Sequence, residues 1–309
     1  MHFTTHTMQE IIPQLKAVLH NKPSLTFETL NPDFARGCYA GETIEVAGKH
    51  YLYHSLRVWM ELAELLECRM LLPQPLEGHR VRITYEKRSN DSFHTHTPTS
   101  KEEKYGSRSH FAKIHKMEEA AFLYYYIQAL ENVKIHHRKT VLNLGVNRGD
   151  EFGVIRNMLE SNTYKRMKLI GIDHSQSALD DAKKVFPEPH VTFHAHDIND
   201  LKSLDLPKAD LLVSIGTLQS PGIHYKPFLM ELVQKHLKKD SALILGFPNS
   251  RWEGGEMLYG AKAPNYAMNE MSLLFNDVMF AKKYLQQKKY RVMITGKQYF
   301  FLTAVKIGQ

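Results

Sequence analysis

The second half of the chain is predicted to be an α/β domain with a parallel sheet, and two observations lead to this prediction. Short apolar runs end in Gly, Asp or Pro, and stretches of helical character separate them. Near-continuous apolar strands of this kind are typical of a parallel sheet whose two faces are covered by helices. The runs are KTVLNLG, MKLIGID, VTFHAHD, ADLLVSIG and SALILGFP, which begin at residues 139, 167, 191, 209 and 241.

The segments between these runs are predicted to be helices. The segment after the first run starts with Asp150 and Glu151, acids that suit a helix N-terminus, and SQSALDDAKKVF starts at Ser175, a good N-cap residue. Two more helices are expected, over residues 226–237 and around residues 275–285. The apolar residues that mark the last helix are Phe275, Val278, Met279 and Leu285.

The chain ends in two adjacent strand-like runs, YRVMITGK and QYFFLTAVK. Gly296 lies near their junction, where a tight turn favours glycine. The two runs therefore predict an antiparallel hairpin, which a simple doubly wound sheet does not have.

Residues 1–110 are predicted to form a smaller N-terminal α+β domain with a linker, and residues 111–309 the second domain. GETIEVAGKHYLYHS suggests two strands around Gly48, LRVWMELAELLECRML a buried helix, and GHRVRITYEK another strand. The polar stretch 88–109 is expected to be a long loop. A helix over residues 110–130, HFAKIHKMEEAAFLYYYIQAL, is expected to lead into the second domain.

The composition is that of an ordinary globular protein of 309 residues, 43% of them hydrophobic. The sequence shows no long apolar run, and its two cysteines, Cys38 and Cys68, have no metal-like spacing. We therefore expect a cytoplasmic protein. The net charge of +7 favours an anionic partner such as RNA, but much of the excess is interleaved with acids, which is equally typical of solvated helix faces.

The stretch VLNLGVNRGDE joins the first apolar run to its helix and contains Gly145, Asn147 and Gly149. A glycine loop in this position lets backbone N–H groups face a polar ligand at close range. Glycine also ends strands for structural reasons alone, so this loop by itself is a weak indication of a cofactor.

Two acids follow the next two apolar runs. Asp173 precedes a capped helix, where its carboxylate would accept hydrogen bonds from ribose hydroxyls, or would simply cap the helix. Asp197 and the N–H of Ile198 would read an adenine ring, although Asp197 alone fits a turn equally well. Together with the glycine loop, these groups fall at the strand ends where open α/β sheets bind ligands.

In this order and spacing, the motifs resemble those of the class I S-adenosylmethionine-dependent methyltransferases. NLGVNRG is similar to the first motif of that family, GIDHS to the second, HDIND to the third and ADLLVSIGTL to the fourth. The resemblance covers residues 139–309. It implies a seven-stranded, Rossmann-like sheet with an antiparallel C-terminal hairpin, and S-adenosylmethionine as cofactor.

The resemblance also implies roles for single residues. Gly145, Asn147 and Gly149 would shape the loop beneath the methionine part of the cofactor, and Asn143 stands where the family often has an acid. The remaining implied cofactor contacts are Asp173, His174, Asp197, Ile198, Ser214 and Gly216. No catalytic residue is predicted, because aligning and desolvating the acceptor beside an activated methyl group can suffice.

The methyl acceptor is expected to contact the segment after the fifth apolar run and a part of the polar loop before the second domain. An ordinary surface loop is an equally good interpretation of the first segment. A small metabolite is slightly favoured over RNA, especially tRNA, because no dense basic stripe with interleaved aromatics is visible. The candidate acceptor residues are Tyr105, Asn249, Arg251, Trp252, Tyr259 and Tyr266.

Two other classes of function stay open. A nicotinamide-dependent oxidoreductase would use the same kind of sheet but requires a fuller GxGxxG loop. A non-catalytic partner protein would retain the fold alone. No metal site is predicted, because the pairs His94 with His96 and His194 with His196 bring no third ligand at metal-site spacing.

Overall fold

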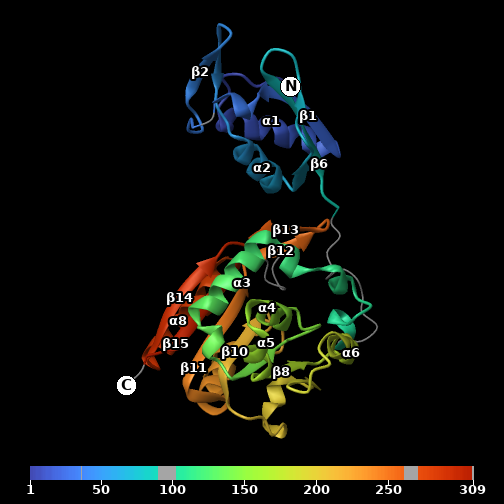
Figure 1. The fold of residues 1–309 in the computed structure, drawn as a ribbon. Coiled ribbons are helices and arrows are strands. Elements are labelled where there is room, and N and C mark those ends of the chain that lie inside the picture. Colours follow the sequence, from blue (N-terminus) through green and yellow to red (C-terminus); the bar gives the residue numbers. More distant parts are fainter. Residues whose placement is uncertain (36, 90–101, 261–270, 308–309) are drawn as a thin grey trace. The chain divides into compact units, whose positions relative to one another are not determined.

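The computed structural model describes residues 1–35, 37–89, 102–260 and 271–307 (Figure 1). The chain divides into two compact units, an N-terminal unit of Met1–Asp91 and a C-terminal unit of Ser92–Gln309. The sequence placed the division near residue 110. Within the stretch that the sequence assigned to the linker, residues 103–107 make their contacts with the C-terminal unit.

A seven-stranded sheet is the centre of the C-terminal unit, with the strand order β14-β15-β11-β10-β7-β8-β9 (Figure 1). The pairs among β9, β8, β7, β10 and β11 are parallel, whereas β15 runs antiparallel to both β11 and β14. The strands are β7 (Thr140–Leu144), β8 (Lys168–Asp173), β9 (Val191–Ala195), β10 (Ala209–Ile215), β11 (Leu237–Pro248), β14 (Tyr290–Gly296) and β15 (Tyr299–Lys306).

Helices cover the two faces of this sheet, and each face has its own apolar core. Side chains of α3, α4, α5 and α6 pack on one face, and side chains of α7 and α8 on the other. The helices are α3 (Ala120–Asn132), α4 (Asp150–Met158), α5 (Ser161–Lys165), α6 (Gln176–Val185), α7 (Tyr225–Glu231) and α8 (Met271–Gln287). The shorter elements are η2 (Glu102–Tyr105), η3 (His110–Lys113), η4 (Lys116–Glu118), η5 (Ile135–His137), η6 (Ile198–Ser203), η7 (Leu232–His236), β12 (Ser250–Glu253) and β13 (Glu256–Tyr259).

The predicted fold class is confirmed. Each of the apolar runs forms a strand, and β7 and β10 are buried along their whole length, as expected for strands covered on both faces. The two final runs form the expected antiparallel pair of β14 and β15. The helices α4 and α6 begin where predicted, with the Ser175 hydroxyl accepting a hydrogen bond from the backbone N–H of Ala178.

The helix predicted over residues 110–130 is wrong in its first half. The α-helix begins only at Ala120, and the residues before it form the short 3-10 turns η3 and η4. Ser109 caps η3, and Ile114 then adopts extended backbone geometry that ends it. The ammonium of Lys116 lies near the rings of Phe111 and Tyr299, and such tertiary contacts outweigh a local preference for helix.

The buried face of α8 was also predicted wrongly in part. Phe275 and Met279 are 51% and 41% exposed. The residues that pack into the core recur at helical spacing and include the predicted Val278 and Leu285. They are Leu274, Val278, Ala281 and Leu285.

The N-terminal unit contains a separate antiparallel sheet in the order β1-β6-β4, with β5 also paired to β6, and a β2–β3 hairpin. Phe27 lies at the centre of its core, with the rings of Trp59 and Tyr85 5.1 and 5.2 Å away between centroids. The elements are α1 (Met8–Asn21), β1 (Ser24–Leu30), η1 (Pro32–Ala35), β2 (Thr43–Val46), β3 (Lys49–Leu52), α2 (Leu56–Leu65), β4 (Cys68–Met70), β5 (Gln74–Pro75) and β6 (Arg80–Lys87).

The predicted strand pair around Gly48 and the strand at β6 are confirmed, whereas α1 and β1 were not predicted. A reciprocal capping box between Thr7 and Glu10 starts α1. The predicted helix over 56–71 ends at Leu65, because Cys68–Met70 pair with β6 as a strand.

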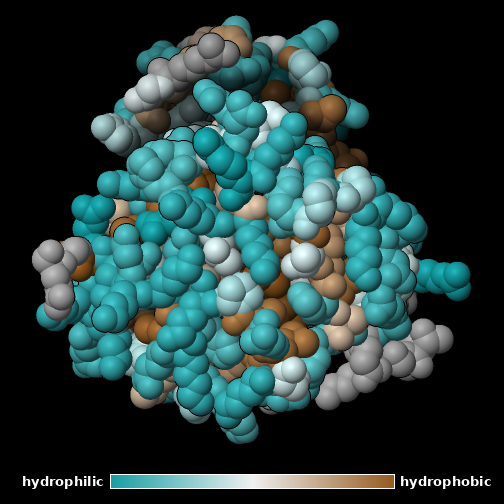
Figure 2. Space-filling view, turned by 60° about the horizontal axis from the view of Figure 1, so that its bottom comes forward, coloured by the Kyte–Doolittle hydropathy of each residue, from teal (hydrophilic) through white to brown (hydrophobic). Residues whose placement is uncertain are grey.

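The surface in the view of Figure 2 is mostly hydrophilic, with small hydrophobic areas between the polar side chains. Within the described part of the chain, the helices are all too short or too polar to span a membrane.

Candidate functional site

The glycine loop of residues 145–149 joins β7 to α4 at the carboxyl edge of the sheet. Gly145, Asn147 and Gly149 have φ values of +76°, +45° and +84°, in the left-handed region. A Cβ on Gly145 would lie 1.9 Å from Oγ1 of Thr217, so a larger residue would require Thr217 to shift. Asn147 occupies the left-handed region at lower cost than most side chains. The loop therefore has the backbone shape that the sequence predicted.

Asp173, at the end of β8, is 6% exposed and holds two neighbouring segments. One carboxylate oxygen accepts a hydrogen bond from the backbone N–H of Asn147 at 2.9 Å, and the other accepts from the N–H of Ser175 at 3.0 Å. The helix-capping role that the sequence offered as an alternative for Asp173 belongs to Ser175. Asp173 instead orders the glycine loop and the turn before α6. Each oxygen retains a second lone pair for a ligand hydroxyl.

Asn143 has a carboxyl group beside it, although it is not itself an acid. Its Nδ2 donates to Oε2 of Glu151 at 3.5 Å, and both side chains are buried. Burial and, second, the charge of Asp150 raise the pKa of Glu151 to about 7, against the opposing effect of Lys116. Glu151 therefore brings a carboxyl to the place where the methyltransferase motif often has one.

Lys116 and Tyr299 complete this polar cluster. The Lys116 ammonium lies 5.4 Å from the ring centroid of Tyr299. Burial lowers the pKa of Lys116, but Tyr299 and Glu151 raise it by more, and its net pKa is raised. The hydroxyl of Tyr299 lies 3.6 Å from the position that a Cβ on Gly216 would take, just after β10.

The sequence did not indicate Glu151, Lys116 or Tyr299 as candidate site residues. Glu151 was interpreted only as a favourable acid at a helix N-terminus, and Lys116 was placed within a longer helix. An acid shortly after a strand in which Asn143 replaces the usual acid was the available signal for Glu151. The proximity of Lys116 and Tyr299 depends on packing between distant segments, so no local pattern shows it.

The residues expected at the adenine end are more dispersed. Asp197 is exposed, and its Oδ1 accepts from the backbone N–H of Asn199 at 2.9 Å, which is the turn-forming role. The Ile198 side chain is buried in the core. His174 is exposed beside Asp173, with its ring centroid 6.2 Å from that of Tyr105.

Ser214 lies inside the sheet, where its hydroxyl donates to the backbone oxygen of Leu144 at 3.2 Å. This hydrogen bond ties β10 to β7 at their carboxyl ends. Ser214 therefore has a structural partner, and Gly216 is the group of this strand end that faces Tyr299.

The candidate acceptor residues after β11 form a small antiparallel hairpin of β12 and β13. Asn249 is fully buried, and its Nδ2 donates to the backbone oxygen of Lys297 at 3.0 Å, so it anchors the β14–β15 turn. Arg251 pairs with Glu253 at 2.9 Å. Trp252 is half-buried, and Tyr259 is 56% exposed.

Tyr266, like His94 and His96, lies outside the described residues. Among the candidate acceptor residues that the structure describes, Tyr105 lies at the glycine loop, where its backbone oxygen accepts from Nδ2 of Asn147 at 2.8 Å. The described segments contain no group of three or more His, Cys, Asp or Glu side chains arranged to hold a metal ion.

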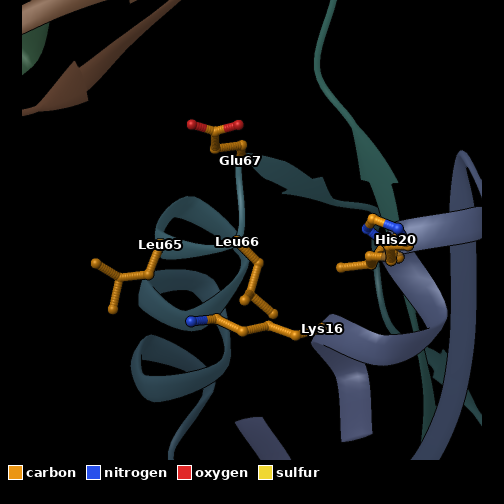
Figure 3. Close-up of a pocket in the computed structure, with 6 residues that line it drawn as sticks. Lys16, His20, Leu65, Leu66 and Glu67 are labelled. Carbon is orange, nitrogen blue, oxygen red and sulfur yellow. The ribbon is translucent and has the colours of Figure 1, made fainter. Parts of the chain in front are cut away.

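Two hollows in the described structure lie away from Asp173. One, of about 390 Å³, borders the outer side of the loop at Arg148, Gly149 and Asp150. The other, of about 280 Å³, lies in the N-terminal unit and is shown in Figure 3. Its labelled residues are Lys16, His20, Leu65, Leu66 and Glu67, a set without convergent catalytic groups. The strand edge is the better candidate, because the loop and the buried carboxyls meet there.

Comparison with known proteins gives structural similarity at low identity. No protein-family model and no curated protein sequence matches the chain. A precorrin-6y methyltransferase from Geobacter metallireducens is 14% identical, with a TM-score of 0.40 over 59% of this chain and 87% of that chain. A SAM dependent methyltransferase from Aquifex aeolicus is 16% identical, with a TM-score of 0.40 over 58% of this chain and 89% of that chain.

The plantazolicin methyltransferase BpumL, in a complex with SAH, is 12% identical, with a TM-score of 0.43 over 62% of this chain and 88% of that chain. The strand order and the antiparallel β15 of the C-terminal unit are those of a methyltransferase-type Rossmann-like sheet.

Proposed function

We propose that the C-terminal unit binds S-adenosylmethionine and transfers its methyl group to an acceptor, with a small metabolite favoured over RNA. One observation carries this proposal. Asp173 and the Asn143–Glu151 pair are two buried carboxyl sites on either side of a left-handed loop at the carboxyl edge of the sheet. A ligand with a ribose diol at one end and an ammonium group at the other matches this pair of sites.

The nucleoside end of the cofactor fits Asp173 and its neighbours. The carboxylate of Asp173 would accept hydrogen bonds from the ribose hydroxyls through its remaining lone pairs. The exposed His174 and Asp197 follow the ends of the adjacent strands β8 and β9, where the adenine would lie. Asp173 therefore has two functions in this proposal, since it also orients the loop through the N–H of Asn147.

The methionine end fits the polar cluster around Glu151. An ionised Glu151, oriented by Asn143, would bind the α-ammonium group, and the Lys116 ammonium would bind the α-carboxylate. The charges of Lys116 and Glu151 are thus complementary to those of an amino-acid head group. This arrangement accounts for Asn143, because the carboxylate is supplied by the first turn of α4 instead of by β7.

When bound, the cofactor supplies an electrophilic methyl group on a sulfonium, and the residues of this chain align the acceptor and exclude water. Tyr299 is 8% exposed, and its hydroxyl lies beside Gly216. That hydroxyl would hold a polar atom of the acceptor by a hydrogen bond. The rings of Phe122 and Phe301, 5.1 and 6.5 Å from the Tyr299 ring between centroids, keep it in place.

For the N-terminal unit, we propose a role in recognising the acceptor. Its described surface exposes large apolar side chains, with Tyr39 81%, Leu65 78% and Leu72 91% exposed. The interleaved charges of the chain support the preference for a metabolite over RNA, since phosphate binding depends on clustered lysine and arginine.

Incubation with S-adenosylmethionine labelled in its methyl group tests the function and the acceptor class together. The substrates are the small-molecule, RNA and protein fractions from cells that lack this gene. We expect label in the small-molecule fraction, and no transfer by an Asp173→Asn variant. Label in RNA alone would replace the metabolite by RNA as acceptor, and no transfer to any fraction would contradict the proposed activity.

A further inference from the structure

A short segment of residues 103–107, called the strap below, lies across the candidate cofactor site. Two backbone contacts hold it to both sides of the strand edge. The backbone oxygen of Tyr105 accepts from Nδ2 of Asn147 at 2.8 Å, and the backbone N–H of Ser107 donates to Oγ of Ser177 at 3.0 Å. The strap thus connects the glycine loop with the first turn of α6.

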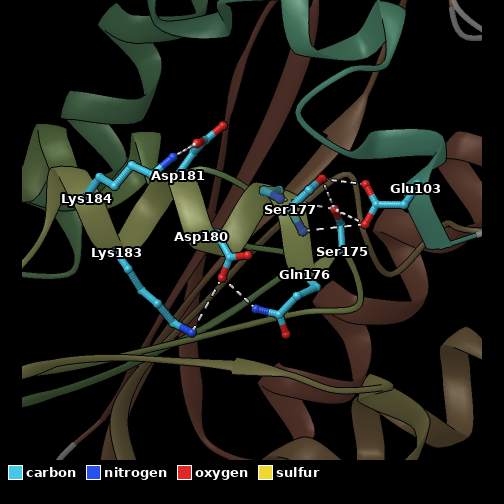
Figure 4. A network of polar contacts seen from close by, with 9 residues as sticks. Glu103, Ser175, Gln176, Ser177, Asp180, Asp181, Lys183 and Lys184 are labelled. Atoms are coloured by element: carbon cyan, nitrogen blue, oxygen red, sulfur yellow. Dashed lines mark hydrogen bonds and ion pairs between the residues drawn. The ribbon is translucent and has the colours of Figure 1, made fainter.

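The carboxylate of Glu103 fastens the strap at the N-terminus of α6 (Figure 4). It accepts hydrogen bonds from the hydroxyl of Ser175 at 3.3 Å, from the backbone N–H of Ser177 at 3.5 Å and from the hydroxyl of Ser177. The N-terminus of a ten-residue helix offers free N–H groups and a favourable dipole for an anion. Glu103 therefore makes a charge-assisted contact that a neutral residue cannot match.

Gly106 lies against the fastened carboxylate. A Cβ at this position would lie 1.8 Å from Oε2 of Glu103 and 2.7 Å from Oγ of Ser177. Because Oε2 is the end of a flexible side chain, an alanine at position 106 would displace the Glu103 carboxylate from its contacts with α6. A Gly106→Ala substitution would therefore release the strap without altering a charge.

Tyr105, in the middle of the strap, lies over the same edge. Its ring centroid is 5.0 Å from that of Phe111 and 6.2 Å from that of His174. Burial raises the pKa of the Tyr105 hydroxyl, and the charge of Asp173 is among the groups that raise it further. Tyr105 therefore lies within the electrostatic field of the carboxylate expected to bind the ribose, and that carboxylate is 6% exposed.

We infer that the strap is an autoinhibitory latch, which covers Asp173 in the fastened state and must release from α6 to admit the nucleoside end of the cofactor. The inference rests on the proposed function, since it regulates the same site. A ligand that binds only the released state has its apparent affinity reduced by the fraction of molecules in that state. Weakening the latch should therefore strengthen cofactor binding.

Calorimetry and stopped-flow binding of S-adenosylhomocysteine to the full chain test this inference. Glu103→Ala and Gly106→Ala release the latch by independent changes, one by loss of the charge and the other by steric exclusion. Asp181→Asn is the matched control, because it breaks the exposed pair of Asp181 with Lys184 at 2.8 Å on the same helix without touching the strap (Figure 4).

We expect both release variants to bind about tenfold more tightly than wild type, with faster association, and the control to be unchanged. Trypsin provides a second readout, because Lys104 and Arg108 flank Tyr105. Cleavage there should be faster in both release variants, and faster in wild type when the ligand is saturating.

The opposite pattern would overturn the inference. If the release variants bind more weakly, and the ligand protects Lys104 and Arg108 in wild type, the strap is a part of the binding site that closes over the cofactor. If neither wild type nor the release variants bind the ligand, the proposed function is contradicted. The cleavage rates of the variants without ligand then decide separately whether Glu103 fastens the strap.

Discussion

At the scale of single residues, Glu151 is the group whose properties depend most on the fold. Its side chain is 8% exposed, and the pKa of its carboxyl is about 7. In the unfolded chain the group ionises near pH 4.5. The folded protein therefore holds one more proton at this site than the unfolded chain between these two pH values.

The additional proton on Glu151 makes the free energy of unfolding depend on pH. Because the folded-state pKa is raised, the stabilising contribution is complete below pH 4.5 and is lost as the pH rises through about 7. The difference corresponds to about 3 kcal/mol of unfolding free energy. A Glu151→Gln variant should lose this pH dependence and be more stable than wild type at pH 8 in the absence of ligand. Denaturant unfolding at pH 5, 6, 7 and 8 measures it, and parallel curves for both proteins would show that Glu151 titrates normally.

The affinity for the ligand should increase when Glu151 loses its proton, whereas the stability of the protein without ligand should decrease. Only the ionised carboxylate attracts an ammonium group, so the affinity for S-adenosylhomocysteine should rise between pH 6 and pH 8 in wild type. Glu151→Gln should bind more weakly by about tenfold at pH 8, with no rise over this range. Equal affinities of the two proteins at pH 8 would remove Glu151 from the site.

Gly145 allows a test of the loop geometry at a single residue. Gly145→Ala introduces both backbone strain at φ +76° and a clash with Thr217, whereas Gly255→Ala introduces strain alone at φ +82° with open space around the Cβ. We expect the first variant to lose about 1–3 kcal/mol more stability than the second. Thermal unfolding compares them, and similar losses would mean that Thr217 moves away without cost.

At the scale of elements, α8 shows that the sequence predicted the helix itself but only a part of its buried face. Leu285→Ala should cost about 2–5 kcal/mol, because it leaves a cavity against the sheet. Phe275→Ala should cost less than about 1 kcal/mol, since that ring is half exposed. Denaturant unfolding of the two variants measures these losses of stability. A larger loss for Phe275→Ala would mean that the face of α8 that carries Phe275 lies in the core.

The elements also show why the prediction from sequence succeeded where it did. The apolar strands and the Gly, Asp and Pro residues after them are local features, and β7, β8 and β10 formed as predicted. The prediction of a helix before α3 failed because the contact of Lys116 with Tyr299 joins segments nearly two hundred residues apart. For the same reason, no local sequence pattern could predict that Lys116 and Tyr299 lie close together.

The site residues were likewise predictable only where their positions depend on neighbouring residues in the sequence. The shape of the glycine loop and the position of Asp173 at the end of β8 were accessible from sequence, because both depend on neighbouring residues. The contact of Asn143 with Glu151 bridges eight residues across a loop and needs the turn itself to be known. Asn249 could not be assigned from sequence, because its role depends on the distant β14–β15 turn.

At the scale of the whole molecule, the two compact units with separate cores should respond differently to a ligand. Saturating S-adenosylhomocysteine stabilises only the unit that binds it. Differential scanning calorimetry should show that the ligand shifts the transition of the C-terminal unit upward and leaves that of the N-terminal unit in place. A shift of both transitions together would mean that the units unfold cooperatively.

The most direct test of the central claim is the titration of S-adenosylhomocysteine into the full chain by calorimetry, with an Asp173→Asn variant beside wild type. The account predicts one molecule bound per wild-type chain and an affinity at least about tenfold weaker in the variant, because a neutral amide loses the charge-assisted hydrogen bonds to the ribose hydroxyls. Circular dichroism of the variant should remain that of the folded protein. Absence of binding by wild type, or equal binding by both proteins, would contradict the assignment of this strand edge as a cofactor site.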